Sequence, residues 1–323
     1  MGATPLTAND IHAKFVLKVE DGVTTATPLW KRLKSSGKIE GGLASTTFQS
    51  QLETGTIGVG TMDTMSAPEA TVPNLMETVT WTAGGYLGQY FLPDVEKKIH
   101  DGPNWLSGKS LQAQCGDRLN KDFQLAFETA WFGDDTTSTP PGWGGFGYMF
   151  VNSGSVAGKD VSTTTGWKVR YIDASVSLNG QTFSQAPAMH ILNAIFQTQN
   201  VGLNLQGGPD LGVTTNTVLM GLAMKINNGY QRIVSYEDRA KFGATSVELS
   251  GVPFYWSPAC SSGNIYLLDT STLGVRHVGD SLLVDRSGTA QVPMGTYHQT
   301  WTYSQIFCES LRRNARLVNV TIS

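Results

Sequence analysis

Residues 110–133, SLQAQCGDRLNKDFQLAFETAWFG, carry the clearest periodic pattern in this chain of 323 residues. Their apolar side chains recur every three or four positions, the spacing that gathers side chains on one face of an α-helix. Gly133 follows directly, and glycine is common just beyond the end of a helix. The pattern predicts a helix over about 110–132 whose buried face comprises Leu111, Cys115, Leu119, Phe123, Ala126, Phe127, Ala130 and Trp131.

Helices and strands are mixed further along the chain. After the link PPGWGGFG (140–147), the segment SQAPAMHILNAIFQTQ (184–199) predicts a second helix, with Ser184 as a cap and Pro187 in the first turn. Residues 207–234 indicate a loop, a short buried strand and a helix, and 246–278 alternate as strands do. The segment 296–322 predicts two more strands, broken near Glu309 to Asn314.

The first half of the chain is poor in such patterns. Its first forty residues show no sustained period, so we expect an extended arm. The segments STTFQSQLE (45–53) and METVTWTAGGYLGQYF (76–91) predict two strands joined by a glycine- and methionine-containing tip, 55–70. Such a hairpin has too little core of its own to be stable and must lie on another surface. Because helices and strands do not alternate regularly, the predicted fold class is α+β.

Composition narrows the class of protein. Charged residues make up 15% of the chain, against roughly 25% in typical soluble domains, which favours an obligate assembly. A net charge of -3 argues against a surface built to neutralise phosphates. The three cysteines have no disulfide or zinc spacing, so a reducing, intracellular origin is expected. No membrane span or signal peptide is recognisable.

Catalytic motifs are missing from the sequence. The five histidines lie in separate contexts without metal-binding spacing, and Asp134 with Asp135 is typical of a solvated loop. There is no nucleophile elbow, phosphate loop or dinucleotide fingerprint. The tryptophans are spread singly and are expected to be core or interface anchors. We therefore predict no catalytic residue, no cofactor and no metal site.

Basic residues gather in TPLWKRLKSSGKIEGG (27–42), while residues 43–96 contain no lysine or arginine at all. The cluster has two interpretations: a small nucleic-acid patch with Trp30 available for stacking, or a contact with the acidic side chains of a neighbouring subunit. Its position before an acid-only segment favours the second. Leu29, Trp30 and Leu33 should pack as a short amphipathic turn, and Gly41 and Gly42 should supply a bend.

A second basic group near the C-terminus is either a solvated edge or a contact with an acidic surface. The intersubunit contact candidates are Trp30, Lys31, Arg32, Lys34, Lys38, Glu53, Asp63, Glu69, Glu77, Arg312, Arg313 and Arg316.

The order of these parts resembles that of the major capsid proteins of tailed bacteriophages, which share the Hong Kong 97-like shell fold with encapsulins. TPLWKRLKSSGKIEGG is similar to the family's lead into an extended loop. LNKDFQLAFETAWFGDD followed by PGWGGFGYMFV resembles the end of its long spine helix. GKDVSTTTGWKVRYID agrees mainly around Trp167, and the stretches 247–276 and 309–320 resemble later strands.

The resemblance implies a domain plan. Residues 1–42 would be the N-terminal arm and 43–93 the extended loop, or E-loop. Residues 94–184 and 296–323 would form the peripheral domain with its spine helix, and 185–295 the axial domain. The implied function is a structural one, without catalysis: self-assembly, as hexamers and pentamers, into an icosahedral shell around double-stranded DNA.

The resemblance also implies partners: a separate scaffolding protein, a portal and cement or decoration proteins, with weak DNA contact at most and no membrane. The expected location is the virion capsid, assembled in the bacterial host cytoplasm. Some relatives join neighbours through a lysine on the extended loop, but 43–96 contains none, so no isopeptide cross-linking is expected. Two alternatives stay open: an encapsulin-like nanocompartment shell, and a soluble enzyme with an unrecognised site.

Overall fold

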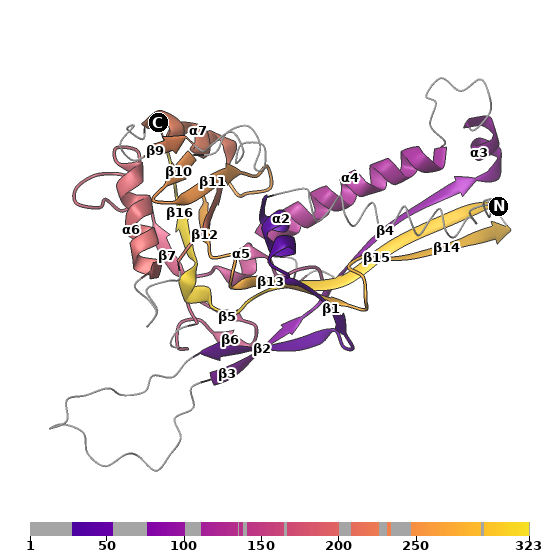
Figure 1. The fold of residues 1–323 in the computed structure, drawn as a ribbon, viewed down its shortest axis with the longest axis horizontal. Coiled ribbons are helices and arrows are strands. Elements are labelled where there is room, and N and C mark those ends of the chain that lie inside the picture. The colour runs from indigo at the N-terminus through magenta and orange to yellow at the C-terminus, as the bar shows by residue number, and fades with distance from the viewer. Residues whose placement is uncertain are drawn as a thin grey trace, which may run out of the picture. The chain divides into compact units, whose positions relative to one another are not determined.

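The computed structural model describes residues 28–53, 76–100, 111–134, 136–137, 141–164, 167–199, 208–225, 231–233, 247–291 and 294–322 (Figure 1). They belong to two compact units. Unit 1 takes the described parts of Met1–Thr46, Ala83–Phe146 and Gly274–Ile306, and unit 2 those of Thr47–Thr82, Gly147–Leu273 and Phe307–Ser323. Both contain helices and strands, which confirms the α+β class.

A five-stranded sheet forms the framework of unit 1. Its long strand β15 (Met294–Cys308) pairs antiparallel with β4 (Gly84–Pro93) and with β14 (Val284–Gln291). Next to β15 lies β13 (Leu273–Val278), which pairs in parallel with β1 (Ile39–Leu43). The sheet therefore joins strands within 39–93 to strands within 273–308, from opposite ends of the chain.

The helix predicted over about 110–132 is confirmed as α4 (Leu111–Phe132), with α3 (Asp94–His100) before it. It packs against β4, where Leu119 and Phe123 approach Gly88. Phe127 and Trp131 are buried at its C-terminal end, and the Gly133 amide donates to the Thr129 carbonyl at 3.0 Å. The apolar stripe read from the sequence thus faces the core: Leu119 and Phe123 meet β4, and Trp131 meets the rings of Trp30 and Trp143.

The segment before β1 is a helix, α2 (Pro28–Ser35), which confirms the short amphipathic turn. Leu29, Trp30 and Leu33 are all buried. The Trp30 ring lies 5.4 Å from that of Trp131 and 6.0 Å from that of Trp143. The expected extended state is therefore wrong for 28–35, because burying these side chains on one helical face stabilises the helix. The rest of the arm, 1–27, lies outside the described residues.

The two strands predicted from 45–53 and 76–91 begin as a hairpin of β2 (Thr47–Glu53) and β3 (Met76–Thr82). The strand predicted over 76–91 is wrong in its length. It is interrupted at Ala83, and the residues that follow form β4, which pairs with β15 and not with β2. A side chain at Gly84 would clash with the backbone of Gly142, which explains a glycine here. The tip, 55–70, lies outside the described residues.

Unit 2 is built on a seven-stranded sheet. Its order is β7 (Arg170–Asp173), β16 (Ala315–Val318), β12 (Ile265–Leu268), β8 (Leu211–Thr214), β11 (Val252–Trp256), β10 (Val247–Leu249) and β9 (Gln231–Ile233). The two predicted helices are confirmed as α6 (Pro187–Gln199) and α7 (Asn216–Lys225). The prediction of Ser184 as the cap is wrong, because α6 begins only at Pro187. Their buried side chains share one core with the sheet, including Ile191, Ile195, Leu219, Leu222, Phe254, Ile265, Leu267 and Leu317.

Smaller elements complete unit 2: α5 (Phe146–Met149) at its border, β5 (Ser155–Val156), β6 (Lys159–Asp160) and the 3-10 helix η1 (Leu311–Arg313). The break predicted near Glu309 to Asn314 is η1. The β2–β3 hairpin is held by ring contacts of Trp81 with Trp167, at 6.1 Å, and of Phe48 with Phe307, at 5.7 Å. The described part of the hairpin thus packs against other residues of unit 2 in the same chain.

Candidate assembly surfaces and the polar network around Asp269

The basic cluster lies on and just after α2. Lys31 and Lys34 are exposed, and Arg32 and Lys38 are half-buried. Trp30, in contrast, is 1% exposed and belongs to the aromatic core of unit 1. Its assignment as an intersubunit contact is therefore wrong, as is the idea that it stacks on a base, because its ring has no free face. Helical spacing separates the two roles: the apolar residues face inward and the lysines outward.

An ion pair that sequence reasoning missed follows this cluster. Arg276 Nε of β13 lies 2.8 Å from a Glu40 carboxylate oxygen of β1, and the two residues are partners in the parallel pairing. Their side chains are 26% and 43% exposed, so the pair is worth no more than about 1 kcal/mol. No signal in the sequence relates two residues that are 236 positions apart.

Two of the four candidate acids lie in described strands. In the hairpin register Glu53 is opposite Met76, and Glu77 is opposite Leu52, so both acidic positions lie at the same end of the hairpin. Asp63 and Glu69 lie outside the described residues. The register therefore places these two positions in successive pairs of the hairpin.

The C-terminal arginines are used differently from the lysines of α2. Arg316 Nε donates to Asn264 Oδ1 at 3.1 Å, and its Nη1 donates to the Phe150 carbonyl at 3.0 Å. The guanidinium also lies 5.4 Å from the centre of the Tyr266 ring. Arg313 forms an ion pair of 2.7 Å with Asp269. Both groups thus bind acceptors within unit 2, and their assignment as intersubunit contacts stays a prediction.

Arg312 is half-buried, and its assignment as a contact stays a prediction.

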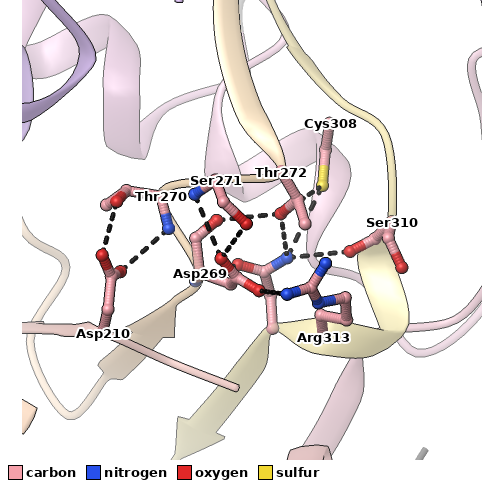
Figure 2. A network of polar contacts seen from close by, with 9 residues as sticks. Asp210, Asp269, Thr270, Ser271, Thr272, Cys308, Ser310 and Arg313 are labelled. Atoms are coloured by element: carbon pink, nitrogen blue, oxygen red, sulfur yellow. Dashed lines mark hydrogen bonds and ion pairs between the residues drawn. The ribbon is translucent and has the colours of Figure 1, made fainter. Parts of the chain in front are cut away.

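A polar network surrounds Asp269, at the turn between β12 and β13 (Figure 2). Asp269 Oδ1 accepts hydrogen bonds from the amide and hydroxyl of Ser271, at 3.0 and 2.6 Å. The Asp269 amide donates to Asn314 Oδ1 at 2.8 Å. Asn314 Nδ2 donates in turn to Thr272 Oγ1 and to the Ser310 carbonyl. On the other side, Asp210 accepts from the amide and hydroxyl of Thr270.

The electrostatics of this network suit a structural role. Burial raises the pKa of the Asp269 carboxyl, against the opposing effects of the Ser271 hydrogen bond and the Arg313 charge. Burial also raises the pKa of the Cys308 thiol to about 12, so it stays a protonated, unreactive thiol at neutral pH. The network ties η1 and β16 to the β12–β13 turn without activating a nucleophile.

The remaining groups considered for chemistry also serve the fold. Asp134 Oδ1 accepts from the amide and hydroxyl of Thr136, as in a turn, while Asp135 lies outside the described residues. His190 is buried and its Nε2 lies 3.1 Å from the Gln181 carbonyl. Across the described ranges, no group of three histidine, cysteine or acidic side chains could hold a metal ion.

One groove lies on unit 2, with a volume of about 720 Å³, at the N-terminal half of α6. Its lining includes Met189, Leu192, Phe196 and Lys225. Among the helices that the structure describes, none is long and apolar enough to cross a membrane.

Solved shell proteins have the same fold along almost the whole chain. The capsid protein of cyanophage A-1(L) is 13% identical with a TM-score of 0.64, over 90% of this chain and 93% of that one. The capsid of the native GTA particle is 12% identical with a TM-score of 0.59, over 88% and 89%. The holo-SrpI encapsulin complex from Synechococcus elongatus is 10% identical with a TM-score of 0.54, over 92% and 89%.

No protein-family model and no curated protein matches the sequence. At identities of 10 to 13%, the likeness to the solved structures is one of fold. The chain has the Hong Kong 97-like shell fold, which confirms the expectation that came from the order of its motifs.

Proposed function

We propose that this chain is the major capsid protein of a tailed bacteriophage, and that copies of it assemble into the icosahedral shell around double-stranded DNA. One observation carries the proposal: about nine tenths of the chain matches about nine tenths of several shell proteins. Such a shell is stabilised by surface buried between copies, and it requires heterologous contacts that close on themselves. Its function is structural, without catalysis or cofactor.

Within this shell, 94–184 and 296–323 would be the peripheral domain, and 185–295 the axial domain directed at the centres of hexamers and pentamers. Residues 1–42 would be the arm and 43–93 the extended loop over a neighbour. Support comes from α4, which has the length and place of a spine helix, and from the β2–β3 hairpin. The course of β4 into the sheet of unit 1 favours ending the loop near Thr82.

The exposed basic surface of α2 is our proposed contact with the extended loop of an adjacent copy. Lys31, Lys34 and their neighbours Arg32 and Lys38 would lie against the acids of 43–96, a segment without a compensating cation. Electrostatic complementarity of this kind selects the register and partner more than it adds affinity. A separate scaffolding protein, a portal and cement or decoration proteins would be the further partners. The shell would be assembled in the bacterial host cytoplasm and would form the capsid of the virion.

An encapsulin-like compartment is the second candidate, because the encapsulin complex from Synechococcus elongatus has the same fold. The two candidates differ in content: a phage shell would hold DNA, and a compartment would hold protein cargo. The contents of particles isolated from the natural host therefore distinguish the two candidates.

The test is expression of the full chain, followed by sedimentation and negative-stain electron microscopy. We expect closed, uniform particles. A chain that stays monomeric over a wide concentration range, also with a co-expressed scaffolding candidate, would overturn the proposal. Particles that contain nuclease-protected DNA after infection would identify a phage capsid, and particles filled with one host protein would identify a compartment.

A further inference from the structure

The strand pair β1–β13 contains an irregularity built from two glycines and a buried histidine. Glu40 is paired with Arg276, and Leu43 with Val278, so three steps along β1 correspond to two along β13. Gly41 and Gly42 therefore both lie opposite His277, as in a β-bulge. Gly42 has a φ of +84°, which favours glycine, and its amide donates to the Gly279 carbonyl at 2.7 Å.

The His277 ring fills the space that a side chain at position 41 would need. A Cβ added to Gly41 would lie 2.5 Å from His277 Cε1 and 3.0 Å from Nε2. The histidine is only 5% exposed, and within the described part of the chain its Nδ1 has no hydrogen-bond partner. A ring in this position packs well when it is neutral, and a proton on Nδ1 would create a buried donor without an acceptor.

From this geometry we propose that His277 and the Gly41–Gly42 bulge form an acid-sensitive joint, at which β1 separates from β13 when the imidazole is protonated. The separation would release the stretch that leads from α2 into the β2–β3 hairpin. The proposal concerns the isolated chain and does not depend on shell formation.

Burial and the charged groups around the His277 ring together set its pKa. On β13 and the turn after it, Arg276 is paired with Glu40, and Asp280 is exposed and favours the charged imidazole. On the other side, β15 contains no carboxylate, lysine or arginine, and its His298 lies in the half that pairs with β4 and β14. Burial outweighs the Asp280 charge and the backbone groups of Val278 and Gly279, so the pKa of His277 is lowered from 6.5.

The sign of the effect follows from this lowered pKa. The closed joint binds the proton less tightly than the open joint does, so the closed state has its full stability above about pH 6.5. As the pH falls below this value, the open state gains protons first. The opening equilibrium then rises by up to about tenfold per pH unit, until the closed state is protonated as well.

Amide hydrogen exchange of the full chain, read by mass spectrometry, tests the joint. Labelling times at pH 7.5, 6.5 and 5.5 are scaled to the intrinsic exchange rate, so that only the opening equilibrium is compared. We expect protection of the peptide over 39–43 to fall by several-fold or more between pH 6.5 and 5.5, and that over β16 to stay constant. An unchanged wild-type protection at 39–43 would overturn the proposal.

Three variants sharpen the test. His277→Asn removes the titration and should keep 39–43 equally protected at all three pH values. Gly41→Ala places a methyl group against the ring and should open β1 already at pH 7.5. His190→Asn, which alters a buried histidine of unit 2, is the matched control and should keep the wild-type pH dependence. The proposal fails if acid lowers the protection of 39–43 in His277→Asn as it does in the wild type. It also fails if 39–43 is unprotected in this variant at all three pH values.

Discussion

The lysines around α2 and the arginines of the C-terminal segment both appear in the sequence as clusters of basic residues. In the structure the lysines are exposed, and the arginines bind acceptors of their own unit. Lys31 and Lys34 are exposed on a helix whose other face is buried. Arg313 and Arg316 end within unit 2, where a carboxylate, an amide oxygen and a carbonyl accept from them. The guanidinium groups are therefore bound to acceptors of their own unit, whereas the α2 lysines are distinguished by their exposure and remain candidates for a contact with another copy.

The side-chain chemistry fits the two roles. A guanidinium has several donors in a fixed plane and can satisfy separate acceptors while it lies over aromatic rings. An ammonium group on a flexible stem is strongly hydrated and stays in solvent at little cost. The following substitutions would break or sharpen the comparison, and they are ordered by their expected effect on stability.

The largest effect is expected from Trp30→Ala. It removes a ring packed against Phe127, Trp131 and Trp143, and should lower the free energy of unfolding by about 3–5 kcal/mol. Lys31→Ala, one residue further along α2, is the matched control and should change it by less than about 0.5 kcal/mol. Urea unfolding of both variants measures the difference, and equal losses would refute the two-faced helix.

Arg316→Ala should cost about 2 kcal/mol, because Asn264 and Phe150 lose a charged donor. Arg316→Lys should recover little of this loss, since a single ammonium group cannot reproduce the planar contacts with two acceptors. The same unfolding measurement applies. Full recovery by lysine would mean that only the charge of Arg316 matters, as on the surface of α2.

The double reversal Arg32→Glu and Lys34→Glu should leave the unfolding free energy within about 1 kcal/mol of the wild type and yet reduce the yield of closed particles severely. The double reversal Lys168→Glu and Arg170→Glu, at exposed positions of unit 2, changes the net charge equally and is the control. Particle yield is measured by sedimentation. Normal assembly together with reduced DNA retention would restore the nucleic-acid interpretation of this cluster.

No covalent effect at all is expected in denaturing gels of mature particles. The segment 43–96 has no lysine that could attack a neighbour's side chain. A single band at the monomer mass is therefore predicted. A ladder of multiples would show that a lysine outside 43–96 does form the bond.

Periodicity and turn residues were enough to predict α4, α6, α7 and the paired strands of the hairpin, because each has a local signal. The end of β3 at Thr82 was missed, since the following residues, as β4, pair with the distant strand β15. Trp30 was assigned both to a buried turn and to an interface, and only the aromatic side chains of α4 decide between them. The acceptors of Arg316 lie 52 and 166 residues away, beyond any local pattern.

The position of β15 has a consequence for the order in which the protein can fold during synthesis. This strand supplies the partners of both β4 and β14, yet the ribosome makes it some 200 residues after β4. Until then α4 has no completed sheet to cover, and loop-closure entropy makes so distant a pairing slow. The sheet of unit 1 can therefore be completed only after nearly the whole chain has been translated.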